Sequence, residues 1–232
     1  MGGRVSERST DLVVVTDPGA AAAAVAEILV EAAEAGGSVV MAGGSTPRRA
    51  YELAAALEGD WGGADLWFGD DRCVPPDDPL SNQLLVRESL LDRIIVPPTV
   101  HPIPTGLPAD EAAAAYDAAL RDEPLDVVLL GLGADGHTAS LFPDASTLDE
   151  RDRLVVAAAP GLDPFVERVT LTIPALESGA HVVFLVVGSD KADAVRRAFA
   201  EEPSRSTPAS LVRSREGRTT VILDAAAASL LP

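Results

Sequence analysis

The sequence predicts an α/β fold with a largely parallel sheet, and three observations predict it. Short apolar segments recur along the chain, alanine-rich stretches long enough for helices separate most of them, and turn residues such as Gly, Pro and Asp separate the two kinds of segment. The chain has 232 residues, a length that one α/β domain commonly reaches. No repeat or long linker divides it, so we expect a single domain over residues 1–232.

The first apolar segment, residues 12–16, is expected to be a buried strand. Asp17 and Pro18 are typical of an N-cap and a first helical residue, and the helix that they begin is expected to end near residue 35, before a pair of glycines. The elements expected next, in chain order, are a strand at 38–41, a helix over 48–57, a strand at 64–68, a helix over 82–93, a short extended piece within 96–106 and a helix over 109–122.

Residues 125–131 are the most strongly apolar segment in the middle of the chain and predict a strand. The elements expected after it are strands at 153–159, 168–173 and 181–188, a helix over 190–200, and two short strands near 210–213 and 218–223 before a terminal helical turn.

Charge and composition argue against several classes of function. The chain has 36 acidic and 18 basic residues, so its net charge of −18 repels nucleic acids and anionic membranes. No apolar run reaches the roughly 18 residues that a membrane span requires. A single cysteine, Cys73, is typical of a reducing compartment, and the N-terminal residues lack the apolar stretch of a secretory signal. We therefore expect a cytoplasmic protein. We also expect a monomer or weak homo-oligomer.

Three polar loops follow strands, where ligands bind in open α/β sheets. The first loop contains Gly43, Gly44, Ser45 and Thr46 before Pro47. Its glycines allow a close backbone approach, its hydroxyls can donate hydrogen bonds, and the helix N-terminus that follows favours an anion. The loop resembles a phosphate cradle, although it is neither a Walker A loop nor a GxGxxG motif. The alternative is a plain strand-to-helix turn, and the segment alone favours neither.

The second loop places Arg72 after two acidic residues at a strand end. A guanidinium held there could be aimed at an oxyanion or a phosphate, although the segment alone favours a solvated charge cluster. The neighbouring Cys73 could in principle act as a thiolate nucleophile, but lone cysteines are more often simply packed.

The third loop, residues 131–138, carries Asp135 and His137 among three glycines. A turn can let a carboxylate orient an imidazole, and a histidine with a pKa near 6.5 suits a general base at neutral pH. The alternative is a structural turn with a capping aspartate, and we favour the functional interpretation because glycines crowd a histidine at the mouth of a sheet. A metal site is not expected, because the sequence shows no third ligand.

Two other histidines and one lysine also lie near predicted strands or loops. His101 lies between prolines and His181 opens a strand, so both are expected to be structural or surface residues. Lys191 is the only lysine in the chain and follows a strand. A specific need for a compact ammonium group and chance retention at a helix start explain it equally well.

These segments resemble the glucosamine-6-phosphate isomerase/6-phosphogluconolactonase family, on its lactonase side. The matching segments, in the family's order, are GGSTP at 43–47, GDDRCVP…SN from 69 to 82, GLGADGHTASLFP at 131–143, RVTLT at 168–172 and VVFLVVGSDKADAV at 182–195. The resemblance implies a Rossmann-like α/β fold, doubly wound, with a mostly parallel sheet and helices on both faces. It also implies hydrolysis of 6-phospho-D-glucono-1,5-lactone to 6-phosphogluconate in the oxidative pentose phosphate pathway, without a metal or organic cofactor.

For that substrate, His137 is the expected general base, Asp135 orients its ring, and Arg72 fixes the lactone or steadies its developing negative charge. The residues expected to bind the 6-phosphate are Gly43, Gly44, Ser45, Thr46, Arg168 and Lys191. No GxSxG motif is present, which argues against an acyl-serine route.

Two positions depart from the family pattern. Asp71 stands where the family more often has Glu, and Glu177 stands where it usually has Asn, a position that we expect to be structural. One alternative function is a glucosamine-6-phosphate deaminase/isomerase, whose relatives carry a glutamate shortly after the DGH element, where this chain reads Ser-Leu-Phe-Pro at 140–143. Another is a non-catalytic sugar-phosphate sensor.

Overall fold

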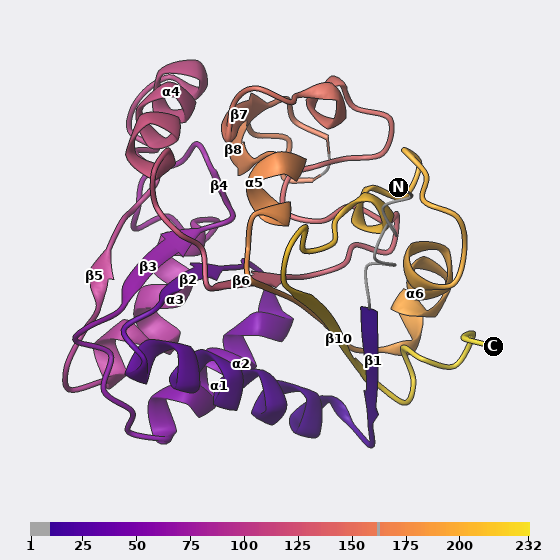
Figure 1. Cartoon of the computed structure of the whole chain (residues 1–232). Helices are drawn as coiled ribbons and strands as arrows, with labels where there is room; N and C mark the ends of the chain where they lie inside the picture. Colours follow the sequence, from indigo (N-terminus) through magenta and orange to yellow (C-terminus); the bar gives the residue numbers. More distant parts are fainter. Residues whose placement is uncertain (1–9, 162) are drawn as a thin grey trace, which may run out of the picture.

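The computed structural model describes residues 10–161 and 163–232, and its main feature is a seven-stranded sheet in the order β1-β10-β9-β6-β2-β3-β5 (Figure 1). Every pairing between neighbouring strands of this sheet is parallel. Its strands are β1 (Thr10–Val15), β2 (Ser38–Met41), β3 (Asp65–Phe68), β5 (Thr99–Val100), β6 (Val127–Leu130), β9 (His181–Val186) and β10 (Arg218–Asp224). The parallel sheet confirms the predicted fold class.

A second, three-stranded antiparallel sheet has the order β4-β8-β7. It consists of β4 (Asp70–Arg72), β7 (Val155–Ala158) and β8 (Arg168–Leu171). The helices are α1 (Pro18–Glu34), α2 (Ser45–Ala56), α3 (Asn82–Ser89), α4 (Ala109–Leu120), α5 (Ile173–Glu177) and α6 (Ala192–Phe199).

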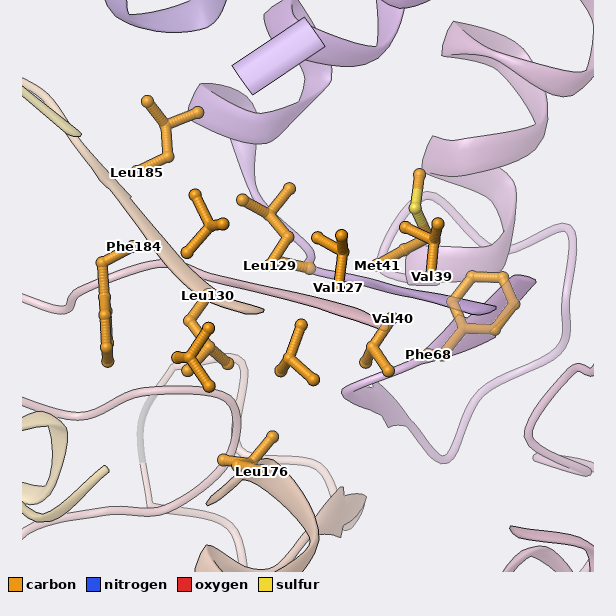
Figure 2. Packing of buried hydrophobic residues seen from close by; sticks show 14 of the residues in the cluster. Val39, Val40, Met41, Phe68, Val127, Leu129, Leu130, Leu176, Phe184 and Leu185 are labelled. Atoms are coloured by element: carbon orange, nitrogen blue, oxygen red, sulfur yellow. The ribbon is translucent and has the colours of Figure 1, made fainter. Parts of the chain in front are cut away.

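Helices cover both faces of the main sheet, as a doubly wound fold requires. Successive strand residues point to opposite faces, so an apolar run such as 38–41 is buried on both sides. Figure 2 shows Met41 and Leu129 pointing to the face that α1 and α2 cover, while Val40 and Leu130 point the other way, toward Leu176 of α5. All five of these side chains are at most 1% exposed.

The order of strands places the candidate loops together. After β2 the chain adds β3 and β5 on one side, and it then returns through β6 to the opposite side of β2. The loops that leave the carboxyl ends of β2 and β6 therefore diverge, and a crevice opens between them. The first and third predicted loops are these two loops.

The structure corrects two predictions. Residues 12–16 were expected to form a buried strand, but β1 is the edge of the sheet, and Leu12, Val13 and Val14 are 39–53% exposed. A run of apolar residues does not reveal which strand has a neighbour on only one side. The strand near 210–213 was also wrong, because Pro208–Leu211 forms a 3-10 turn. Proline lacks the N–H that a strand ladder uses, and its fixed φ suits such a turn.

Other differences concern short elements. The helix expected over 82–93 ends at Ser89 and is followed by a 3-10 turn, Leu91–Arg93. The strand β4 and the helix α5 were not predicted, because three and five residues are too few to show a period. The N-terminal segment used to argue against a secretory signal includes residues 1–9, which lie outside the described residues. Within the described part of the chain, no helix is long and apolar enough to cross a membrane.

Candidate active site

The N-terminus of α2 opens toward the crevice without a cap. Gly44 is the N-cap residue at φ 105°, a conformation that favours glycine, and among the residues that the structure describes no side chain caps this end of the helix. The backbone N–H groups of Ser45 and Thr46 lie in the first turn, where a helix supplies no acceptor, and Pro47 has no N–H. No acidic residue occupies this first turn. The end of the helix dipole is therefore free to attract an anion.

Asn82 joins the first two loops. Its Oδ1 accepts a hydrogen bond from Arg72 Nη1 at 2.8 Å, and its Nδ2 donates to the backbone oxygen of Asp70 at 2.8 Å. A Cβ at Gly43 would lie 2.0 Å from Asn82 Oδ1, so only glycine fits there. The sequence reasoning missed the role of Asn82, although the Ser-Asn pair was part of the family motif.

Two arginines lie side by side in the small sheet. Arg72 of β4 is paired with Arg168 of β8 in the antiparallel register. Burial and the neighbouring Arg72 charge lower the pKa of Arg168, while Asp70 acts in the opposite direction. Asp70 itself is buried and accepts a hydrogen bond from Ser140 Oγ at 2.6 Å. Two guanidinium groups that repel each other are stabilised when an anion binds between them.

Asp71, the position at which the family more often has Glu, bonds to the first turn of α3, whose N-cap residue is Ser81. Its carboxylate accepts hydrogen bonds from the backbone N–H of Asn82 at 2.7 Å and of Gln83 at 3.3 Å. Burial raises its pKa in spite of these bonds. The shorter aspartate therefore serves a structural purpose here, and it holds Asn82 at the start of the helix.

Asp135 and His137 form a hydrogen-bonded pair in the loop after β6. Asp135 Oδ1 lies 2.6 Å from His137 Nδ1 and also accepts from the His137 backbone N–H at 3.2 Å. Partial burial raises the pKa of Asp135, but the hydrogen bonds and charge of His137 outweigh it, and the net pKa is lowered. An ionised Asp135 selects the His137 tautomer that has its proton on Nδ1, which leaves Nε2 as a proton acceptor.

A cavity of about 450 Å³ brings these groups together. His137, Arg72 and the six residues predicted to bind phosphate all line it, together with Asp70, Asn82 and Asp190, which were not predicted. Asp135 lies behind the imidazole and lines a neighbouring cavity of about 420 Å³. The position of Asp135 fits an orienting residue that does not touch the ligand. The part of the chain that the structure describes contains no group of three or more His, Cys, Asp or Glu side chains that could hold a metal ion.

Lys191 and Cys73 differ in their position relative to the cavity that contains His137. Cys73 does not line this cavity, whereas Lys191 lines it next to an acidic side chain. Lys191 lines the cavity, and its Nζ is 3.6 Å from Asp190 Oδ2. Burial and nearby acidic residues raise the pKa of the Cys73 thiol, which disfavours a thiolate nucleophile.

His101, His181 and Glu177 do not line the cavity that contains His137. His101 stacks on Trp67 and bonds to Asp65, and His181 bonds to Thr220, so both are structural, as predicted. Glu177 ends α5 and pairs with Arg215 at 3.5 Å.

Comparison with known proteins identifies related chains. The model of the family "glucosamine-6-phosphate isomerases/6-phosphogluconolactonase" matches residues 16–221. The chain belongs to this family. The 6-phosphogluconolactonase of Nostoc sp. is 37% identical to it, in an alignment that covers 84% of both chains. The 6-phosphogluconolactonase of Streptomyces coelicolor is 37% identical to it, in an alignment that covers 96% of this chain and 92% of the relative.

A solved structure of 6-phosphogluconolactonase from Trypanosoma brucei has the same architecture as this chain. It aligns with a TM-score of 0.84 and 30% sequence identity, over 97% of this chain and 100% of the other. The resemblance that the motifs indicated is therefore confirmed at the level of family and fold.

Proposed function

We propose that this chain is a 6-phosphogluconolactonase, which hydrolyses 6-phospho-D-glucono-1,5-lactone to 6-phosphogluconate in the oxidative pentose phosphate pathway. The observation that carries the proposal is the Asp135–His137 pair beside a cavity that also contains an uncapped helix N-terminus and three cationic side chains. The family relatives bear the same enzyme name.

His137 acts as the general base in this proposal. Its Nε2 takes a proton from water while the water oxygen adds to the lactone carbonyl carbon, and Arg72 stabilises the oxyanion that forms. The tetrahedral intermediate then collapses, the bond between the carbonyl carbon and the ring oxygen breaks, and the imidazolium returns its proton to that oxygen. The product is a free carboxylic acid, which ionises and releases one proton. Asp135 stabilises the transient positive charge on the His137 imidazolium.

The phosphate binds at the start of α2 in this proposal. Ser45 and Thr46 offer backbone N–H groups and hydroxyls, and Gly43 and Gly44 allow the close approach. Lys191 and Arg168 supply charge there. Because Arg168 lies beside Arg72, a dianion at this site also reduces the repulsion between the two guanidinium groups.

A coupled assay tests the function. Glucose-6-phosphate dehydrogenase produces the lactone in situ, and hydrolysis is followed above the spontaneous rate. We expect His137→Ala to reduce this excess rate by about 10²- to 10⁴-fold, the usual contribution of a general base, while 6-phosphogluconate still binds. Turnover at the wild-type rate in this variant would refute the assignment.

The phosphate site has its own test. Lys191→Met is expected to raise KM by about tenfold or more, with kcat little changed, because the charge contacts a part of the substrate that does not react. An unchanged KM would remove Lys191 from the site. Ammonia release from glucosamine 6-phosphate would favour the deaminase alternative, and phosphosugar binding without lactone turnover would favour the sensor.

We also propose that the enzyme works in the cytoplasm, as a monomer or weak homo-oligomer formed by one domain, and binds no nucleic acid. Its single cysteine and its net charge of −18 support this proposal. Light scattering of the purified protein, with and without added DNA, tests the state of association and the lack of nucleic-acid binding.

A further inference from the structure

The loop that carries Asp135 and His137 is closed by its own hydrogen bonds. Gly133 N–H donates to the His137 carbonyl oxygen at 2.9 Å, and Gly136 N–H donates to the Gly133 oxygen at 2.9 Å. These bonds set the shape of the turn. They do not set how the turn is oriented toward the cavity, because they join the loop only to itself.

The outer side of this loop is held by residues far along the chain. Arg197 of α6 donates from Nη2 to the Ala134 carbonyl oxygen at 3.0 Å and from Nη1 to the Asp135 carbonyl oxygen at 3.4 Å. The backbone N–H of Ala209 donates to the next carbonyl, that of Gly136, at 3.1 Å. Three successive peptide oxygens of the loop thus accept hydrogen bonds from outside it.

Arg197 is itself fixed in place. Its Nη1 donates to Thr207 Oγ1 at 2.6 Å, and its Nε donates to Asp193 Oδ2 at 2.9 Å. The contact with the loop is close, since a Cβ on Gly136 would lie 2.9 Å from Thr207 Cγ2 and 3.1 Å from Arg197 Nη1. A guanidinium with several fixed donors restricts the rotation of the peptide groups that it bonds.

We propose that Arg197 is a positioning residue, which holds the Asp135–His137 pair in its productive orientation by bonding the two carbonyl oxygens before and at Asp135. This proposal rests on the proposed function, in which His137 is the base. Arg197 does not line the cavity that contains His137, so it acts through the loop and does not touch the substrate. An unanchored loop would let the imidazole move by fractions of an ångström, and enzymes are sensitive to such displacements.

The same helix also reaches the proposed phosphate site. Lys191 directly precedes α6, and Arg197 lies six residues further on, which is about 9 Å along a helix axis. The 3-10 turn Ser189–Lys191 and the helix α6 that directly follows it therefore carry both the ammonium group proposed to bind the substrate phosphate and the guanidinium that anchors the base. Replacing Arg197 removes its bond to Asp193 in the first turn of α6, but Arg196 still pairs with Asp193 and Lys191 itself is unchanged. We therefore expect kcat to change far more than KM.

Arg197→Met tests the proposal, with Arg196→Met as the matched control. Arg196 is the preceding residue of the same helix and pairs with Asp193 and Glu201, but it has no bond to the loop among the described contacts. In the coupled lactonase assay we expect kcat of Arg197→Met to fall by about 10- to 100-fold with KM within about threefold, and Arg196→Met to behave like the wild type. Arg197→Lys, which cannot reach both carbonyls at once, should recover part of the loss.

Nitrogen and proton NMR of the histidine side chains gives a readout that general destabilisation does not move. The chain has only three histidines, so the His137 signals can be assigned by substitution. In Arg197→Met, the Nδ1–H signal of His137 should shift or broaden at temperatures where the fold is intact. Should Arg197→Met not fold, Arg197→Lys carries the same measurements.

Wild-type kcat together with an unchanged His137 signal in Arg197→Met would overturn the proposal, and so would equal losses in Arg197→Met and Arg196→Met. These outcomes differ from a failure of the proposed function. If His137→Ala retains turnover, the base assignment is wrong. The NMR comparison then still decides whether Arg197 orders the pair.

Discussion

Gly133 is the position where the smallest change should have the largest effect on the proposed catalytic pair. A Cβ built on Gly133 lies 2.1 Å from His137 Nδ1 and 2.5 Å from Asp135 Oδ1. The backbone at Gly133 is not in the left-handed region, so alanine meets a steric obstacle and no backbone strain. Gly133→Ala therefore perturbs the Asp135–His137 pair with one added carbon.

The size of the effect follows from these distances. Side-chain Cβ atoms essentially never approach other atoms more closely than 3.0 Å, so the imidazole must move by about 1 Å or the loop must open by a similar amount. A displacement of about 1 Å can reduce the rate of an enzyme by about 100-fold, which corresponds to about 2.7 kcal/mol of transition-state stabilisation. We expect Gly133→Ala to lower kcat by that factor.

The coupled lactonase assay measures this loss, and thermal unfolding checks that the variant is folded. Gly106→Ala is the matched control, since a Cβ at Gly106 has nothing within 4 Å and Gly106 does not line the cavity. It should retain wild-type kcat. If Gly133→Ala also retains it, then the Asp135–His137 geometry does not limit the reaction, and the reasoning fails.

Two further predictions concern the second loop and the pH dependence of stability. Gly43→Ala places a Cβ 2.0 Å from Asn82 Oδ1, the atom that accepts a hydrogen bond from Arg72, so the substitution should displace Arg72. We expect kcat/KM to fall by about tenfold or more and Tm to fall by several degrees. A wild-type Tm and kcat/KM would contradict this. Burial and the Arg218 charge lower the pKa of His181 from 6.5 to about 4. Between pH 6.5 and about 4, the unfolded chain therefore binds more protons at His181 than the folded chain does. Its contribution to stability is therefore complete above pH 6.5 and is lost as the pH falls toward 4. Urea unfolding should show that the wild type loses more stability over this range than His181→Gln, and parallel curves would refute the prediction.

Local contacts explain why much of the fold could be predicted from the sequence. Asp17 was expected to cap the first helix, and its Oδ1 accepts from Ala20 N–H at 3.0 Å. Capping joins residues three apart and needs no other part of the molecule. The pair of Asp135 and His137 is local in the same way, and it was predicted from its spacing and its glycines.

Contacts across long sequence separations could not be predicted. The exposure of Leu12 to Val14 depends on β1 having a neighbour on one side only, and no feature of that segment records its place in the sheet. The bonds of Arg197 to the loop join residues more than 60 positions apart. The motifs indicated where the chemistry lies but did not indicate which residues support it.

The amino-acid sequence by itself determined most of the helices and strands and the loops that carry the proposed reactive side chains, because these follow from short-range periodicity, caps and turns. Its motifs also indicated the family. Only the tertiary structure decided that Arg72 lies opposite Arg168, that Asn82 joins two loops, and that α6 holds the outside of the loop around His137. The physical reason is that strand order and register bring distant segments together through the burial of the whole core, a property that no single segment of the chain contains.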